Sequence, residues 1–123
     1  MQANRKWLLD LSPDRFLCRF YEYAGLPAKA PIYGGWESQG VSGHTLGHYL
    51  SACAMQYAAT GDEEFKSRVD YMVSELARCQ KMYKGLMAGY VGGIPEQERI
   101  FTEIYEGKVY SSGFDLNGGW VPI

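Results

Sequence analysis

The residues best suited to bind a polar ligand lie in glycine-rich loops, and the first of these loops holds Trp36 and Glu37 directly after Gly34 and Gly35. An aromatic ring can pack on the apolar face of a sugar, and a carboxylate can accept hydrogen bonds from adjacent hydroxyls. Paired glycines let the backbone approach a ligand closely. We therefore predict a sugar contact here. The alternative is that Trp36 plugs the mouth of a helical barrel and Glu37 caps the next helix.

Two histidines, His44 and His48, are four residues apart and share one face of a predicted helix. Metalloproteases of the H-E-x-x-H type use this spacing to bind zinc, but His-Thr-Leu-Gly-His lacks their glutamate base. We therefore predict no metal site and expect His44 to line a sugar pocket. His48 is a weaker sugar-binding candidate, because one turn deeper it fits a hydrogen-bonded core histidine. A metal-dependent hydrolase that uses both imidazoles is kept as a rival hypothesis.

Another glycine-rich loop, near the end of the sequence, also combines a polar group, two glycines and an aromatic ring. Here Asn117 precedes Gly118, Gly119 and Trp120. We predict that Asn117 and Trp120 also contact substrate, although an asparagine at this position more often closes a turn. A similar stretch at Tyr90 to Pro95 lacks the lysine and serine or threonine of a phosphate-binding loop.

The three cysteines, Cys18, Cys53 and Cys79, are widely spaced and odd in number. This pattern argues against a disulfide framework and fits no C-x-x-C metal motif. We expect small, buried apolar side chains, so the sequence predicts no metal ligand and no cofactor site in this chain.

Helical periodicity predicts the elements that position these loops. One helix should begin at Ser12-Pro13 and end at Gly25, because serine, proline and glycine favour those positions. Residues 44–59 form a nearly uncharged pattern, typical of a helix buried on almost all sides. A turn at residues 60–62 leads into an amphipathic helix over residues 63–80, antiparallel to the previous one, and a short helix is expected from Glu96 to Glu106. The apolar stripe of the amphipathic helix comprises Phe65, Val69, Met72, Val73, Leu76 and Cys79.

Composition limits the class of protein. The chain has 123 residues, 46% hydrophobic and 21% charged, which is typical of an ordered globular chain of at most one domain. The chain has a net charge of -2 and lacks the cluster of basic residues that nucleic-acid binding needs. No apolar run reaches the roughly 20 residues that span a bilayer, and residues 1–10 do not form a signal peptide. We expect neither a nucleic-acid nor a membrane partner. The compartment stays open between the cytoplasm and export with the signal already removed.

Four stretches resemble one family of enzymes: LSPDRFLCRFYEYAGLPAKAPIYGGWES, GHTLGHYLSACAMQYAATGD, GYVGGIP and FDLNGGWVP. Together they are similar to the N-terminal part of the catalytic domain of glycoside hydrolase families 127 and 146, the β-L-arabinofuranosidase-like proteins. The resemblance covers nearly the whole chain. It implies an (α/α)6 barrel and release of L-arabinofuranose from plant glycans by a retaining mechanism, in which a cysteine nucleophile and a glutamate acid/base work with zinc.

These observations predict an all-α fold, a partial α/α toroid made of the first helical hairpins of an (α/α)6 barrel. A ring of twelve helices needs about 200 residues or more. Residues 1–123 are thus expected to be an N-terminal fragment of the catalytic domain, which needs the remainder of the barrel as its partner and is inactive alone. The resemblance implies that the nucleophile, the acid/base and the zinc ligands lie outside this chain. The alternative is a small self-contained all-α binding or scaffold module without catalysis.

Overall fold

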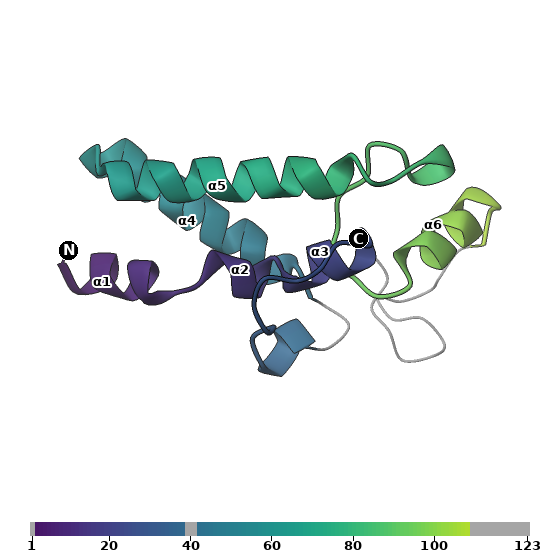
Figure 1. The fold of residues 1–123 in the computed structure, drawn as a ribbon, viewed down its shortest axis with the longest axis horizontal. Coiled ribbons are helices and arrows are strands. Elements are labelled where there is room, and N and C mark those ends of the chain that lie inside the picture. The colour runs from purple at the N-terminus through teal and green to yellow at the C-terminus, as the bar shows by residue number, and fades with distance from the viewer. Residues whose placement is uncertain (1, 39–41, 109–123) are drawn as a thin grey trace.

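The computed structural model describes residues 2–38 and 42–108, and these residues form helices, turns and loops without a β-strand (Figure 1). The prediction of an all-α fold is therefore confirmed for this part of the chain, while closure into a toroid stays a prediction. The α-helices are α1 (Gln2–Asp10), α2 (Pro13–Phe16), α3 (Cys18–Tyr23), α4 (His44–Thr60), α5 (Glu63–Gln80) and α6 (Gln97–Tyr105), and the two 3-10 turns are η1 (Gly35–Ser38) and η2 (Gly85–Met87).

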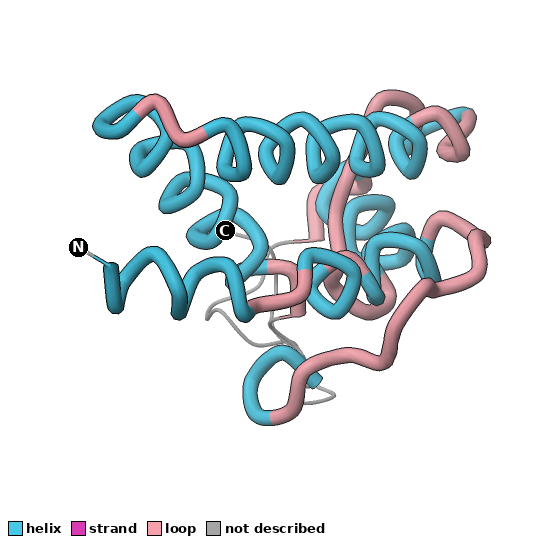
Figure 2. Tube along the Cα trace, turned by 60° about the vertical axis from the view of Figure 1, so that its left-hand side comes forward, coloured by secondary structure: helices cyan, strands magenta, loops and turns pink. Residues whose placement is uncertain are grey.

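The longest helices, α4 and α5, form the predicted antiparallel hairpin (Figure 2). Gly61 ends α4 with a φ of 68°, a left-handed conformation that glycine adopts at little cost. Asp62 then begins α5, because its carboxylate accepts a hydrogen bond of 3.1 Å from the amide of Glu64. Gly61 and Asp62 thus end one helix and begin the next, as their residue types predict.

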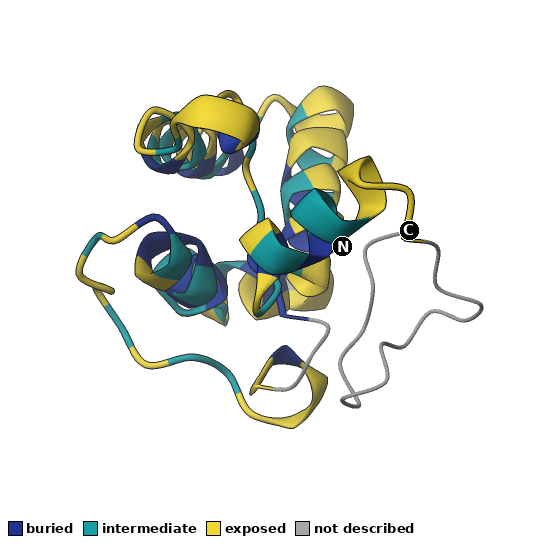
Figure 3. Ribbon diagram, turned by 90° about the vertical axis from the view of Figure 1, so that its right-hand side faces the viewer, coloured by how far each residue is buried: buried dark blue, intermediate teal, exposed yellow. Residues whose placement is uncertain are grey.

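The core lies where α5 and α4 face α2, α3 and the end of α1. Three residues of α5, Phe65, Met72 and Cys79, are fully buried and lie seven residues apart, so they follow one line along the helix. Val73 is 50% exposed, and its predicted place in the buried stripe is wrong. Figure 3 shows the buried segments turned toward one another, with exposed residues on the outer sides. The core comprises Leu8, Phe16, Leu17, Phe20, Tyr21, Ala24, Leu46, Tyr49, Cys53, Phe65, Met72 and Cys79.

Helix α4 buries only one of its sides. Leu46, Tyr49 and Cys53 face the core. The other side carries uncharged side chains that are exposed, so the prediction of a helix buried on nearly all sides is wrong for the described structure. That exposed side comprises His44, Thr45, Gly47, His48, Ser51, Ala54, Met55, Ala58 and Ala59. None of the described helices combines the length and apolarity needed to cross a membrane.

The predicted helix from residue 13 to Gly25 is present, but Leu17 separates it into α2 and α3. Hydrogen bonds from the amide of Leu17 to Pro13 O (2.9 Å) and from the amide of Tyr21 to Leu17 O (3.1 Å) keep the two pieces nearly continuous. Pro13 occupies the start of α2 as predicted, and Gly25 has a φ of 75° after α3.

Helix α1 was not predicted, and contacts from α5 hold it in place. The Arg68 guanidinium donates to the carbonyl oxygens of Leu8 (3.2 Å) and Leu9 (2.6 Å) in the last turn of α1 and of Leu11 (2.5 Å) directly after it. These oxygens have no partner within their own helix, so an arginine from another element can satisfy them. In the N-terminal half of α1, Arg5 pairs with Asp62 at 2.6 Å.

Candidate functional site

The loop that carries Trp36 and Glu37 is anchored by Tyr33. The Tyr33 hydroxyl accepts a 2.9 Å hydrogen bond from the amide of Ser12, and its ring lies 4.7 Å from that of Phe16. The Arg15 guanidinium lies 3.9 Å from the centre of the Tyr33 ring, which is the geometry of a cation–π contact. This aromatic anchor fixes the loop against α2, a few residues before the turn η1.

Turn η1 exposes the side chain of Trp36 and buries that of Glu37. Gly35 starts the turn with a φ of 69°, and the Ser38 hydroxyl closes it with a 2.8 Å hydrogen bond to Gly35 O. The side chain of Trp36 is 76% exposed, whereas Glu37 is only 7% exposed. The turn thus presents an indole to solvent and inserts a carboxylate into the protein.

The Glu37 carboxylate lies at the N-terminal end of α4. Its Oε2 accepts from the amide of Gly43 at 3.2 Å, and its Oε1 accepts from the amide of Thr45 at 3.0 Å. Gly43 precedes the helix and has no side chain to cap it, so Glu37 satisfies amides that would otherwise lack partners. The positive end of the helix dipole also favours a carboxylate there. The capping role considered for Glu37 is therefore present, and it uses two of about four acceptor positions on the carboxylate.

The start of α4 is held by a crossing of two loops at Gly43 and Gly93. A Cβ atom on Gly43 would lie 3.0 Å from the Phe20 ring and 3.2 Å from the Cα of Gly93. A Cβ atom on Gly93 would meet the same ring at 3.0 Å. Next to the crossing, the buried hydroxyl of Ser42 donates to the carbonyl of Gly93. A side chain at Gly43 or Gly93 would therefore have to displace its neighbours, whereas a Cβ built on Gly47 has nothing within 4 Å.

The two histidines lie together on the exposed side of α4. Their Nε2 atoms are 3.0 Å apart, and their ring centroids are 4.6 Å apart with the planes at 80°. His48 is exposed, so its predicted place in a hydrogen-bonded core is wrong, although it does have a hydrogen-bond partner in His44. His44 follows Gly43 directly and is thus adjacent to the Glu37 cap.

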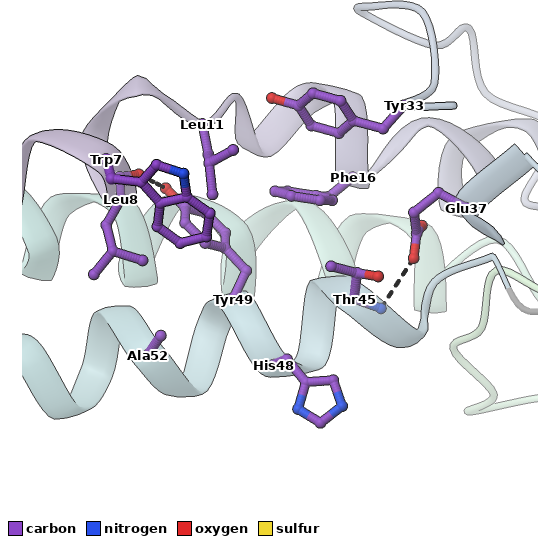
Figure 4. A pocket seen from close by; sticks show the side chains of 10 residues that line it. All are labelled: Trp7, Leu8, Leu11, Phe16, Tyr33, Glu37, Thr45, His48, Tyr49 and Ala52. Carbon is purple, nitrogen blue, oxygen red and sulfur yellow. Dashed lines mark hydrogen bonds between the residues drawn. The ribbon is translucent and has the colours of Figure 1, made fainter. Parts of the chain in front are cut away.

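A hollow of about 430 Å³ lies between α1, α2 and the first half of α4 (Figure 4). Glu37 lies at one end of it, with its carboxylate directed at the amide of Thr45, and the ring of His48 extends away from Trp7 and Leu8. Because most of its lining is aliphatic or aromatic, the hollow suits apolar contacts better than charged ligands. It is lined by Trp7, Leu8, Leu11, Phe16, Tyr33, Glu37, Thr45, His48, Tyr49 and Ala52.

Of the site residues predicted from the sequence, Glu37 and His48 line this hollow. Trp36 and His44 are exposed and do not line it, and Asn117 and Trp120 lie outside the described residues. Trp7 was missed because α1 was not predicted. Tyr49 was also missed, although its position one residue after His48 places it on the inner face of α4. Burial raises the pKa of Tyr49 to about 12, and its hydroxyl donates to Leu8 O at 2.7 Å, so it stays protonated and acts as a structural donor.

The three cysteines are buried and unpaired, as predicted. Burial is the main reason why the pKa of each thiol is raised. A thiol in such surroundings stays protonated and is a poor nucleophile. Within residues 2–38 and 42–108, no three histidine, cysteine, aspartate or glutamate side chains are close enough together to hold a metal ion.

The described residues thus form an all-α arrangement in which a loop carboxylate caps α4 and two exposed imidazoles follow that cap. In a comparison with family models, residues 1–123 match the model of the β-L-arabinofuranosidase GH127 catalytic domain. The chain therefore belongs to this glycoside hydrolase family. A comparison with curated proteins gave no match.

Proposed function

We propose that this chain supplies sugar-binding loops to the catalytic domain of a retaining glycosidase that acts on L-arabinofuranose-containing plant glycans. Family membership supports the general activity, glycoside hydrolysis. The sugar assignment rests on the start of α4, where Glu37 caps the helix, its chain neighbour Trp36 is exposed, and His44, the first residue of the helix, is exposed too.

These three groups offer complementary contacts to a furanose. The indole of Trp36 packs on the apolar face of the sugar ring. The acceptor positions of Glu37 that α4 does not use accept from a hydroxyl, and His44 donates to a neighbouring oxygen. His48, Asn117 and Trp120 complete the proposed set of substrate contacts.

The bond-breaking groups are proposed to lie outside this chain. In a retaining reaction a nucleophile forms a covalent bond to the anomeric carbon, and water then hydrolyses that bond. Cys18, Cys53 and Cys79 do not suit the nucleophilic role, because their thiols are buried and their pKa values are raised. The described residues also do not fit the zinc ion that the resemblance implies, so no step is assigned to it here. Without these groups, the chain alone should not hydrolyse glycosides.

Titration of the chain with methyl β-L-arabinofuranoside, followed by NMR chemical shifts, tests the proposed contacts. A single sugar should bind with a Kd in the millimolar range, about -4 kcal/mol. Trp36→Ala and His44→Ala should each weaken binding at least about fivefold, a loss of about 1 kcal/mol. Glu37→Gln should weaken it too, and its folded fraction must be measured because the same change perturbs the cap of α4.

Tyr105→Ala is the matched control, since Tyr105 is 78% exposed on α6 and takes no part in the proposed site. It should leave the affinity unchanged. Affinities within twofold of the parent for both Trp36→Ala and His44→Ala would refute the site. Equal binding of methyl α-D-xylopyranoside would refute the sugar class. In a family enzyme with its complete catalytic domain, kcat/KM within about threefold after the equivalent changes, under about 0.7 kcal/mol, would also count against the site.

A further inference from the structure

The geometry of the histidine pair points to a second use of this surface: we propose that His44 and His48 together chelate one divalent metal ion that prefers tetragonal coordination, copper(II) or nickel(II). This site is separate from the zinc of the parent enzyme, and it uses two imidazoles that are also proposed to contact sugar, so it is tested in the absence of sugar. Its basis is that the two Nε2 atoms lie 3.0 Å apart and both side chains are exposed.

The distance between the two nitrogens distinguishes coordination geometries. Imidazole nitrogens lie about 2.0–2.1 Å from a bound metal ion, so two adjacent nitrogens are about 2.9 Å apart when the angle at the metal is 90°. In a tetrahedral site the same nitrogens would be about 3.4 Å apart. The 3.0 Å between Nε2 of His44 and Nε2 of His48 is close to the first value.

The ring positions give a second test of the same idea. An imidazole centroid lies about 1.2 Å behind Nε2, so two rings that converge on one ion at 90° have centroids about 4.6 Å apart, against about 5.2 Å for tetrahedral convergence. The centroids of His44 and His48 are 4.6 Å apart. Two nitrogens that pointed straight at each other at 3.0 Å would hold the rings about 5.3 Å apart. The two distances therefore agree with both nitrogens binding one ion at about 90°, and they differ from those of rings that point straight at each other.

The helix provides this arrangement without further support. Residues four apart lie one above the other on a helix face, and both histidines fall within the first two turns of α4. Square-planar and tetragonal sites with nitrogen and oxygen ligands are typical of copper(II) and nickel(II), and copper(II) binds most strongly among the first-row divalent ions. Because the pair is exposed, water can fill the remaining positions around the ion.

Titration of the 123-residue chain with copper(II), and separately with nickel(II), at pH 7.5 in a non-coordinating buffer tests the site. Metal ions bind the neutral form of imidazole, so the titration is run above neutral pH. We expect one ion per chain, tighter binding of copper(II) than of nickel(II) and zinc(II), and an electron paramagnetic resonance spectrum of copper(II) with tetragonal symmetry and two nitrogen ligands. His44→Ala and His48→Ala should each weaken binding at least about tenfold, because one ligand of a chelate is lost.

The sharpest control keeps two imidazoles and changes only their spacing. The double variant His48→Ala/Ser51→His places histidines seven residues apart on the exposed side of α4, about 10 Å along its axis, too far for one ion. It should bind as weakly as His48→Ala, and far-UV circular dichroism should show unchanged helix content in every variant. The proposal is overturned if this variant or His44→Ala binds copper(II) as tightly as the parent chain, or if zinc(II) binds more tightly than copper(II).

Discussion

Replacing Arg68 by methionine should release α1 from the rest of the fold. Methionine keeps much of the apolar stem of arginine but removes every donor that reaches Leu8, Leu9 and Leu11. The carbonyl of Leu8 retains the Tyr49 hydroxyl at 2.7 Å, so the main loss falls on the other two carbonyls. A hydrogen bond to a charged group contributes about 1.5–3 kcal/mol net, and part of that loss is recovered when water reaches these carbonyls. We expect the free energy of unfolding to fall by about 2–3 kcal/mol.

Urea denaturation followed by circular dichroism measures this loss, and amide hydrogen exchange locates it. A nine-residue helix is too short to persist alone in water. Exchange should therefore accelerate across α1 while the α4–α5 hairpin stays protected. The matched control is Arg78→Met, because Arg78 lies exposed on the same helix and makes a single 3.3 Å contact with Glu75, with an expected cost of about 0–1 kcal/mol. The reasoning is refuted if Arg68→Met costs no more than this control, or if exchange in α1 is unchanged.

Two further predictions concern acid stability and helix propensity. The Tyr21 hydroxyl, which donates to the Glu75 carboxylate at 2.6 Å, is the main cause of a lowered pKa of Glu75, and the Lys29 ammonium at 3.0 Å lowers this pKa further. The ionised Glu75 carboxylate therefore stabilises the fold above about pH 4.5, and this contribution is lost as the pH falls through the lower folded-state pKa. Glu75→Gln should therefore flatten the fall in unfolding free energy between about pH 5 and pH 3, measured by urea titrations at each pH, and an unchanged slope would contradict this. Gly47 lies inside α4 with nothing within 4 Å of a built Cβ, so Gly47→Ala should raise the free energy of unfolding by about 0.5–1 kcal/mol; a loss of stability would show that this side of α4 is packed in solution.

How well the sequence predicted each element depended on whether its cause was local. The turn at Gly61 and Asp62 uses residues whose preferences act over three or four positions, and it formed as predicted. Helix α1 has no such signal, because Arg68 binds its C-terminal end and its own Arg5 binds Asp62. Both contacts join residues almost sixty positions apart in the sequence. Periodicity alone therefore could not predict it.

In the candidate site, too, features with a local cause could be predicted from the sequence and features with a long-range cause could not. The position of Glu37 near the start of α4 could be predicted because few residues separate the two in the sequence. The choice between ligand contact and helix capping for Glu37 could not, because it depends on how the loop folds back to within 3.0 Å of the Thr45 amide. The exposure of His48 also depends on which helices surround α4, and a single sequence does not specify those neighbours.

The crossing of Gly43 and Gly93 has a consequence for the order in which the protein folds. The two glycines are far apart in the sequence, and closing so long a loop in an open chain is entropically costly. Helices α4 and α5 run antiparallel, however, so the start of α4 and the end of α5 lie at the same end of the hairpin. Once the hairpin exists, only the segment after Gln80 must close, roughly a quarter of the original loop, which saves about 1.2 kcal/mol at about 0.6 kcal/mol per halving. The hairpin should thus form before the crossing, and the start of α4, with its glutamate cap and histidines, should be among the last parts of the molecule to become ordered.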